Sequence, residues 1–310
     1  MIATITLNPS IDQSFAVKHL VKDDANRALS VTHHAGGKGV NVSKVVRELG
    51  GPTHAYTIQA GFIGKFWASL LKDLDIRYTA HPVPGETRIN TIFTDTGDRT
   101  QTRISAPGPC APLRDQKRFL KMLLAVRPRP FCWVIGGSPA RGMKPGIYRE
   151  YIENLQGAGV PCVLDADDEV LRLGVEARPF MIKPNEYEIQ RLVGRKLSGV
   201  DEYRRAADSL VGRGIEIVIV SLAAKGALFV TRDEAIHVLG IPVPVKSRVG
   251  AGDALVGGFL LGLYRKNGLD GAAALGIAAS TSSVMREAPR HCRRSDIPKL
   301  LKRIKIRRLR

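Results

Sequence analysis

The stretch VGAGDALVGGFL (residues 249–260) places two glycines and an aspartate directly before an apolar run. Glycine loses the most backbone freedom on folding, so such a turn needs a reason. If the apolar run is helical, the N–H groups of Gly250, Ala251 and Gly252 gather at its N-terminus, where the helix dipole favours anions. This arrangement suits a transferring phosphoryl group, and Asp253 is placed to accept a proton from an attacking hydroxyl. The alternative, that Asp253 only caps the helix, explains the aspartate but not both glycines.

Around this stretch, short apolar runs alternate with amphipathic, helix-like segments. The runs are MIATITLN, CWVIGGS, PCVLDA, PFMIKPN and IEIVIVSL, and the helix-like segments include RDQKRFLKMLLAV, GIYREYIENLQGAG and DEYRRAADSLVGRG. Such alternation predicts an α/β fold with a buried, mostly parallel central sheet covered on both faces. Residues 10–31 and 84–105 instead alternate with period two, which predicts antiparallel strands in a small inserted β lid. We expect a single domain over residues 1–310.

The composition is that of a soluble globular protein, with 44% hydrophobic and 25% charged residues. No apolar run reaches the roughly 18 residues of a membrane span, and the N-terminus lacks the features of a signal peptide. We therefore expect a cytoplasmic protein without a membrane partner. The four cysteines form no C-x-x-C pair. Their spacing argues against a zinc site and predicts reduced, mostly buried thiols.

The charge is strongly basic, with 47 Lys and Arg against 29 Asp and Glu, a net charge of +18. Such a surface attracts phosphate-bearing partners. Much of the excess lies in the tail RHCRRSDIPKLLKRIKIRRLR (residues 290–310). Two interpretations are open: an arm that binds nucleic acid or another anionic surface, or a final amphipathic helix. In the second, which the apolar spacing favours, Leu300, Leu301, Ile304 and Ile306 face the core.

A second glycine-rich stretch, HHAGGKGVNVSKVVRELGG (residues 33–51), precedes another predicted helix. Gly36, Gly37 and Gly39 allow close approach of backbone to a ligand, and Lys38 adds a positive charge. The stretch matches neither G-x-x-x-x-G-K-[ST] nor G-x-G-x-x-G. Ordinary turn chemistry is therefore an equal alternative. The helix would bury an apolar face made of Val42, Val45, Val46 and Leu49.

Two further polar sets are candidates. Asn185 and Glu188 follow a strand, and their oxygens suit a hydrated Mg²⁺ near phosphates, although N-x-x-E is also a common helix start. In the lid regions, an aspartate such as Asp12 can bind sugar hydroxyls, and an arginine such as Arg88 can bind phosphate or lie solvated on the surface. The same set includes Arg27 and Asn90.

Taken in order, seven segments resemble the ribokinase-like carbohydrate kinases of the phosphofructokinase-B type. They are TLNPSID (6–12), GGKGVNVSKVVRELGG (36–51), GETRIN (85–90), GGSPARGM (136–143), KPNEYEI (183–189), SLAAKGALFV (221–230) and VGAGDALVGGFL (249–260). GGKG with TRIN looks most like the branch of 1-phosphofructokinases, 6-phosphofructokinases and tagatose-6-phosphate kinases. The resemblance implies a three-layer sandwich with a lid.

The resemblance also implies phosphoryl transfer from ATP, with Mg²⁺, to a hydroxyl of fructose 1-phosphate, fructose 6-phosphate or tagatose 6-phosphate. Asp253 would be the base, and the amides of Gly250, Ala251 and Gly252 would form the anion hole. The acceptor site would comprise Asp12, Arg27, Gly36, Gly37, Lys38, Asn41, Arg88, Asn90 and Ser138, with Arg27, Lys38 and Arg88 on its phosphate. The nucleotide site would comprise Lys183, Asn185, Ser221, Ala223, Lys225, Gly226 and Gly252. Asn185 and Glu188 would hold Mg²⁺, directly or through water, and the lid would form a homodimer contact.

The chain departs from the family pattern near the expected nucleotide. Ala223 replaces the usual glycine, and Arg248 stands where Ser or Thr is usual. Residues 287–289 read Glu-Ala-Pro where relatives carry a small glycine-containing turn, and GGSPARG replaces a Gly-Ser-Leu-Pro-type loop. These departures concern donor preference and any monovalent-cation site, and none involves Asp253.

Two other functions compete with this interpretation. A kinase of an unphosphorylated sugar or a nucleoside would differ only in its acceptor pocket. A non-catalytic protein that binds nucleic acid on a kinase fold would explain the charge and the tail. The chain shows no helix-turn-helix or zinc-finger pattern and only 6% aromatic residues. We therefore expect no nucleic-acid partner.

Overall fold

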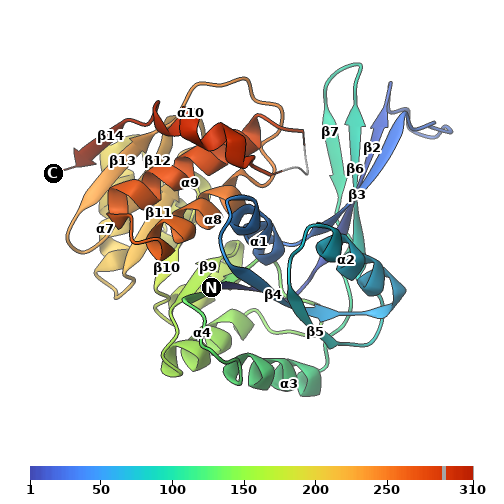
Figure 1. Cartoon of the computed structure of the whole chain (residues 1–310), viewed down its shortest axis with the longest axis horizontal. Coiled ribbons are helices and arrows are strands. Elements are labelled where there is room, and N and C mark those ends of the chain that lie inside the picture. The colour runs from blue at the N-terminus through green and yellow to red at the C-terminus, as the bar shows by residue number, and fades with distance from the viewer. Residues whose placement is uncertain (288–290, 310) are drawn as a thin grey trace.

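A ten-stranded sheet forms the centre of the computed structural model, which describes residues 1–287 and 291–309 (Figure 1). Its order is β14 (Ile306–Leu309), β13 (Ala235–Leu239), β12 (Gly226–Val230), β11 (Ile217–Ser221), β10 (Met181–Ile182), β9 (Cys162–Asp165), β8 (Cys132–Gly136), β1 (Ile2–Thr6), β4 (Thr53–Gln59) and β5 (Tyr78–Pro82). The strands from β5 to β11 pair in parallel, and the other three pairings are antiparallel. The predicted mostly parallel sheet is confirmed.

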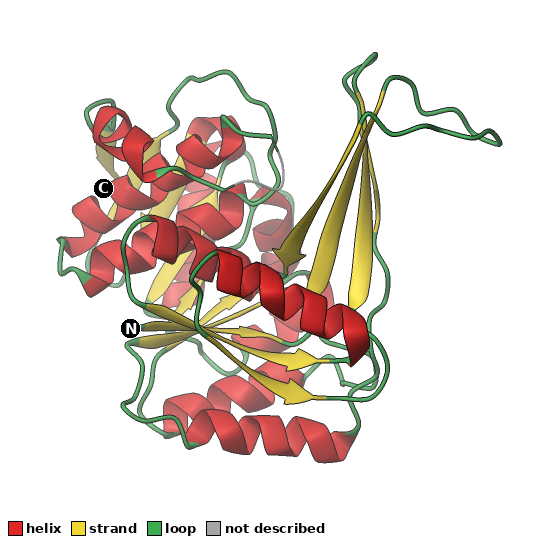
Figure 2. Ribbon diagram, turned by 45° about the vertical axis from the view of Figure 1, so that its right-hand side comes forward, coloured by secondary structure: helices red, strands yellow, loops and turns green. Residues whose placement is uncertain are grey.

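Helices cover both faces of this sheet, as Figure 2 shows. One face carries α3 (Leu113–Leu124), α4 (Ile147–Gly157), α5 (Asp168–Val175), α6 (Glu186–Val193) and α7 (Gly199–Val211). The other carries α1 (Lys38–Glu48), α8 (Ala251–Tyr264), α9 (Gly268–Val284) and α10 (Ile297–Leu301). Alternate strand residues supply the two cores, so Ile5 lies in one and Ile2 in the other. Val42, Val45, Val46 and Leu49 are all buried, as the predicted helix face requires.

A separate four-stranded sheet projects from the end of the central one (Figure 2). Its order is β3 (Ser30–Gly36), β2 (Ser10–Val17), β6 (Arg88–Asp95) and β7 (Gln101–Ile104), and α2 (Gly61–Asp73) packs against its base. The lid was predicted as antiparallel, but β2 and β6 pair in parallel. The reason is topological: β2 follows β1 and β6 follows β5, and these two strands run in the same direction. The strand β3 also extends to Gly36, beyond the predicted limit at residue 31.

The basic tail is not one final helix. The helix α10 ends at Leu301, and the chain closes with β14, which pairs antiparallel with β13. Ile304 and Ile306 alternate with Lys305 and Arg307, and the edge of β13 offers this segment unpaired backbone groups. Leu300 is buried and Ile304 and Ile306 pack against the core, whereas Leu301 is 39% exposed.

The cysteines agree with the expectation of mostly buried, reduced thiols. Cys132, Cys162 and Cys292 are buried and Cys110 is exposed, and all four are free thiols. Within residues 1–287 and 291–309, no helix is long and apolar enough to cross a membrane.

Candidate active site

The helix α8 begins where the glycine-rich stretch predicted. Gly250 is its N-cap in the left-handed conformation, with φ of 79°, and Ala251, Gly252 and Asp253 form the first turn. The N–H groups of a first turn have no partner within the helix and lie at its positive end, although that of Ala251 makes a long contact of 3.4 Å with the carbonyl of Arg248. Asp253 is therefore not the cap, and the capping interpretation is wrong. Its Oδ2 instead accepts a hydrogen bond of 2.8 Å from Nδ2 of Asn41 on α1.

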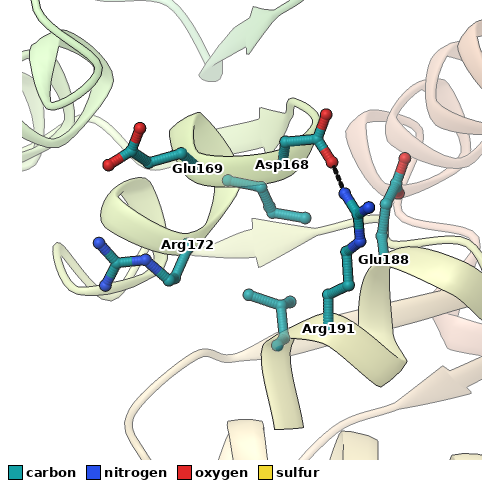
Figure 3. A pocket seen from close by; sticks show the side chains of 7 residues that line it. Asp168, Glu169, Arg172, Glu188 and Arg191 are labelled. Carbon is teal, nitrogen blue, oxygen red and sulfur yellow. Dashed lines mark hydrogen bonds and ion pairs between the residues drawn. The ribbon is translucent and has the colours of Figure 1, made fainter. Parts of the chain in front are cut away.

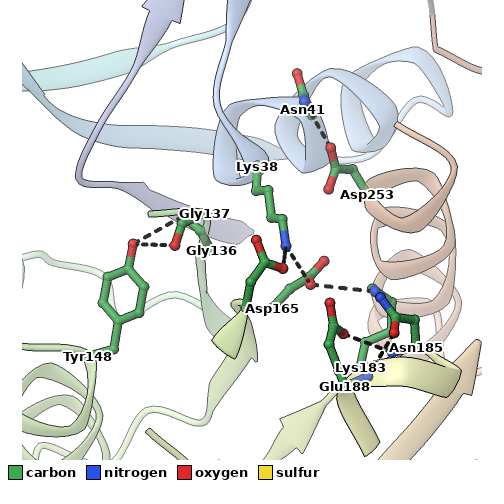
Figure 4. A network of polar contacts seen from close by, with 11 residues as sticks. Lys38, Asn41, Gly136, Gly137, Tyr148, Asp165, Lys183, Asn185, Glu188 and Asp253 are labelled. Carbon is green, nitrogen blue, oxygen red and sulfur yellow. Dashed lines mark hydrogen bonds and ion pairs between the residues drawn. The ribbon is translucent and has the colours of Figure 1, made fainter. Parts of the chain in front are cut away.

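Asp253 is buried, and Figure 4 shows it between Asn41 and a group of lysines and carboxylates. Burial, together with the nearby charge of Asp165, raises the pKa of Asp253 to about 6. Lys38, the hydrogen bond from Asn41 and Lys183 act in the opposite direction. A carboxylate with this proton affinity is ionised at neutral pH and still basic enough to accept a proton.

Lys38 does not stand free. Its Nζ lies 3.3 Å from Oδ1 of Asp165 and 2.7 Å from Oδ1 of Asp167, and Nζ of Lys183 lies 3.5 Å from the same Asp165 oxygen. Burial opposes the charge of Lys38, but the two carboxylates outweigh it and raise its pKa. The two aspartates were missed in the sequence, although VLDAD at the end of a buried strand was a usable signal.

The base of the lid brings a second aspartate into the same region. Oδ1 of Asp12 accepts hydrogen bonds of 2.9 Å from Ser10 Oγ and 2.9 Å from Asn90 Nδ2. A Cβ on Gly36 would lie 2.5 Å from Oδ2 of Asp12, so only glycine fits there. Gly37, with φ of 126°, is the N-cap of α1. The structure therefore brings Asp12, Asn90 and the glycine pair together.

Arg88 is partly buried, so it is not the solvated residue of the alternative interpretation. Its Nη1 donates to the carbonyl of Ala106 at 3.0 Å and its Nη2 to that of Asn8 at 3.1 Å. Nδ2 of Asn8 in turn lies 3.4 Å from Oγ of Ser138, so the two predicted residues are neighbours. Arg27 is not brought to this site, because it lies in the exposed loop between β2 and β3, at the far end of the lid.

Asn185 and Glu188 form a capping box at the start of α6. Oδ1 of Asn185 accepts from the N–H groups of Tyr187 and Glu188 at 2.9 Å each, and Oε2 of Glu188 accepts from N–H of Asn185 at 2.8 Å. Both residues thus have a structural role in holding the helix N-terminus. Burial raises the pKa of Glu188, while that hydrogen bond and Lys183 lower it.

A cavity of about 720 Å³ lies beside the first turn of α8. Predicted nucleotide residues that line it are Asn185, Ser221, Ala223, Gly226 and Gly252, and its apolar walls include Ile241, Val243, Leu255, Ile277 and Val284. Arg248 lies on its rim and is exposed. Lys183 and Lys225 are not in the lining, and Nζ of Lys225 lies 3.7 Å from Glu186. The expected turn at residues 287–289 falls mostly outside the described residues.

A smaller cavity, of about 350 Å³, lies between α5 and α6 (Figure 3). Arg191 pairs with Asp168 across it and stacks over the ring of Tyr187 at 4.3 Å. Glu188 is the one predicted site residue in its lining. The larger cavity is therefore the better candidate for a nucleotide, since its volume and apolar walls match those of a typical ligand site.

The model of the pfkB family of carbohydrate kinases matches residues 5–296. This chain belongs to that family. The protein is therefore a carbohydrate kinase, as the seven segments indicated.

Individual relatives of this pfkB kinase agree with the family assignment. The 1-phosphofructokinase of Bacillus subtilis (strain 168) is 32% identical over 288 residues, which cover 93% of each chain. The crystal structure of Escherichia coli phosphofructokinase-2 in complex with potassium is similar with a TM-score of 0.92 and 29% identity, over 97% of this chain and 98% of that one. Arabidopsis thaliana ribokinase with ribose and ATP, at 20% identity and a TM-score of 0.77 over 97% and 98% of the chains, shares the fold. The predicted ribokinase-like fold is confirmed.

Two further residues of the site, besides Asp165 and Asp167, had no sequence prediction. Lys44, on α1, donates from Nζ to the carbonyl of Ala35 and lies 3.5 Å from Oδ1 of Asn41. His291 reaches the same Oδ1 with Nε2 at 3.2 Å, and a Cβ on Gly250 would lie 2.9 Å from its ring. The spacing of Lys44 three residues after Asn41 on one helix was the signal available for it. His291 is contributed from far along the chain, and no local pattern indicates it.

Proposed function

We propose that this kinase transfers the γ-phosphoryl group of ATP to a hydroxyl of a ketohexose phosphate: fructose 1-phosphate, fructose 6-phosphate or tagatose 6-phosphate. The observation that carries the proposal is the position of Asp253. It is buried in the first turn of α8 and bonded to Asn41, whose helix starts at the glycine pair beside Asp12. Gly252, its neighbour in the same turn, lines the larger cavity. Asp253 thus lies between an acceptor site and a donor site.

In this reaction the oxygen of the acceptor hydroxyl forms a bond to the γ-phosphorus, and the bond between that phosphorus and ADP breaks. Asp253 accepts the proton that the hydroxyl loses. The N–H groups of Gly250, Ala251 and Gly252 stabilise the charge on the transferring group. Asp12 and Asn90 bind sugar hydroxyls, and Gly36 and Gly37 let the sugar approach the backbone. Asn41 holds the base in place.

The phosphate of the acceptor lies near Arg88 and Ser138 in this proposal. Lys38 adds positive charge at the junction with the donor, although Asp165 and Asp167 already neutralise part of it. Since Arg27 lies far along the lid, any contact that it makes with substrate requires another copy of the chain or a movement of the loop.

ATP fits the larger cavity. The apolar walls suit the adenine, Ser221, Ala223 and Gly226 line the side formed by β11 and β12, and Asn185 and Gly252 lie toward the phosphates. Lys183 contacts Asp165, and its Nζ would lie 3.3 Å from a Cβ on Gly252, so its positive charge lies next to this glycine. Lys225 is exposed and lies outside the lining, with Nζ 3.7 Å from Glu186, which lines the cavity.

The oxygen atoms of Asn185 and Glu188 also fit an Mg²⁺ ion that is held mainly by water and by phosphate oxygens. Among the residues that the structure describes, no group of three or more His, Cys, Asp or Glu side chains is arranged as a metal site. Mg²⁺ commonly needs only one or two protein oxygens beside those of a nucleotide. Glu188 and Asn185, next to the cavity, would hold it through water. Bound there, the ion would neutralise charge on the phosphates.

A kinase of an unphosphorylated sugar or a nucleoside is the second candidate. The observation in its favour is that Arg88 already donates to two backbone carbonyls, which leaves fewer donors for a phosphate. Release of ADP from MgATP, measured across sugars, sugar phosphates and nucleosides, decides between the two. We expect turnover with a ketohexose phosphate and a raised KM for it in Arg88→Met. Turnover restricted to unphosphorylated acceptors would contradict the proposal and the phosphate roles of Lys38, Arg27 and Arg88.

We also propose a homodimer through the lid. The face of the lid that points away from Asp12 carries Phe15 and Phe93, which stack at 5.5 Å, with Val31 and Ile104 beside them. Val31 is 44% and Ile104 59% exposed. An exposed apolar face of this kind is typical of a protein–protein contact. One structure of E. coli phosphofructokinase-2 is described as a tetrameric inhibited form, which shows that a relative assembles.

A further inference from the structure

Lys44 places an amine between the acceptor site around Asp12 and the base Asp253. It follows Asn41 by one turn on α1, and its Nζ donates to the carbonyl of Ala35, the last residue before Gly36 and Gly37. Lys44 as a whole is partly buried, and burial has the largest influence on the pKa of its amine. A lysine amine is rarely buried unless its charge is compensated. The position of this amine therefore needs an explanation, and helix formation alone does not supply one.

The amine helps to fix the orientation of Asn41. An amide side chain can present its oxygen or its nitrogen to a neighbour, and only the nitrogen can donate to Asp253. Two donors reach Oδ1 of Asn41: Nζ of Lys44 at 3.5 Å and Nε2 of His291 at 3.2 Å. With its oxygen occupied, Asn41 directs Nδ2 to Oδ2 of Asp253 at 2.8 Å.

The charge of Lys44 also interacts with carboxylates of both the acceptor site and the base. Burial lowers the pKa of Lys44 to about 8, while the carboxylates of Asp12 and Asp253 act to raise it. On its other side lies His291, whose pKa is lowered by burial, by Lys44 and by His34. Lys44 thus lies near enough to Asp12 and to Asp253 for both carboxylates to favour its charged form.

We propose that Lys44 is a positioning residue for phosphoryl transfer, which orients Asn41 toward Asp253 and fixes the base relative to the acceptor strand through Ala35. The proposal rests on the proposed function, since it takes Asp253 as the base. Lys44 acts through its neighbours and does not itself contact the reacting atoms. Such alignment matters because a displacement of about 1 Å at a reacting group costs about 100-fold in rate.

The first test compares Lys44→Met and Lys44→Arg with Arg47→Met, an exposed cation on the same helix. We expect Lys44→Met to lower kcat by about 10-fold to 100-fold and to leave the KM for ATP unchanged. Lys44→Arg should recover part of that loss. Arg47→Met should match the wild type. An unchanged kcat in Lys44→Met, or an equal loss in Arg47→Met, would overturn the proposal.

The pH dependence of kcat separates positioning from simple packing. Activity should decline as pH rises through about 8, where Lys44 loses its proton. Lys44→Arg keeps its charge, so its alkaline limb should move to higher pH. An alkaline limb that is identical in the wild type and Lys44→Arg would overturn the role of this charge.

The free energy of unfolding gives a test that needs no turnover. The unfolded chain binds a proton at Lys44 up to about pH 10.5, whereas the folded protein releases it near 8. Wild-type stability should therefore rise relative to Lys44→Met between these two values. A constant difference would show that the amine is not buried there and would overturn the proposal. If no acceptor is phosphorylated, the proposed function fails, and the positioning role fails with it, but this measurement still decides where the amine lies.

Discussion

At the scale of single residues, Asp253 defines the chemistry, and its pKa predicts the acid limb of the pH profile. Burial raises that pKa to about 6, so the base is protonated and inactive below this value. We expect kcat/KM to fall tenfold per unit as pH drops below about 6. Lys38→Met removes a cation that lowers this pKa, so its acid limb should lie at higher pH. Lys65→Met, on the exposed side of α2, is the matched control, and identical acid limbs in all three proteins would contradict this assignment.

Gly36 gives a second prediction at this scale. The Cβ of Gly36→Ala would meet Oδ2 of Asp12 at 2.5 Å and must displace that carboxylate. We expect a higher KM for the acceptor and a loss of about 1–3 kcal/mol in the free energy of unfolding. Gly146→Ala, where no atom lies within 4 Å of the new Cβ, should change neither. Acceptor kinetics and denaturant unfolding of both variants check this, and an unaltered KM in Gly36→Ala would argue against a sugar site at Asp12.

At the scale of elements, Asn185 has two proposed roles, capping of α6 and binding of Mg²⁺ through water, which substitutions can separate. Asn185→Ala loses the cap and should destabilise the protein by about 1 kcal/mol. Asn185→Ser retains a capping oxygen, so its stability should stay near that of the wild type. If Asn185 also holds Mg²⁺ through water, both variants need more Mg²⁺ for half-maximal activity. Urea unfolding and Mg²⁺ titration measure the two effects, and a normal Mg²⁺ requirement in both variants would limit Asn185 to capping.

The elements also show what the sequence could predict. The parallel strands, α1 and the start of α8 follow from local periodicity and glycine placement, and each lies where it was predicted. The parallel pairing of β2 with β6 could not be predicted locally, because it depends on the direction in which two distant strands leave the sheet. Likewise β14 forms a strand because the edge of β13 is available to it. Tertiary context decided these two cases.

The site follows the same division. The family resemblance assigned Asp12, Asn41 and Asn90 to the acceptor site and made Asp253 the base. In the structure these residues lie in the first few positions of β2, α1, β6 and α8. The pairing of Lys38 with Asp165 and Asp167 depends on a loop from another strand, and the contact of His291 with Asn41 joins residues 250 positions apart. Such contacts arise only once the layers are assembled.

At the scale of the whole molecule, the exposed apolar face of the lid leads us to expect the proposed homodimer. A charge on its apolar face should prevent the proposed dimer, because a lysine cannot be buried there without a partner. We expect Ile104→Lys to be monomeric in sedimentation velocity, and Thr32→Lys, on the opposite face of the lid, to sediment like the wild type. Identical sedimentation of wild type and Ile104→Lys would show that this face is not the dimer contact.

The central claim, that Asp253 is the base of a sugar-phosphate kinase, is tested most directly by Asp253→Asn. The measurement is single-turnover transfer of labelled γ-phosphate from ATP to the ketohexose phosphate that the wild type uses, with calorimetric binding of both substrates measured alongside. The account predicts a loss of at least about 100-fold in the transfer rate with binding of both substrates retained, since the amide can still accept a hydrogen bond from Asn41 but cannot accept the proton. A transfer rate within a few fold of the wild type would contradict it and assign the proton to another group.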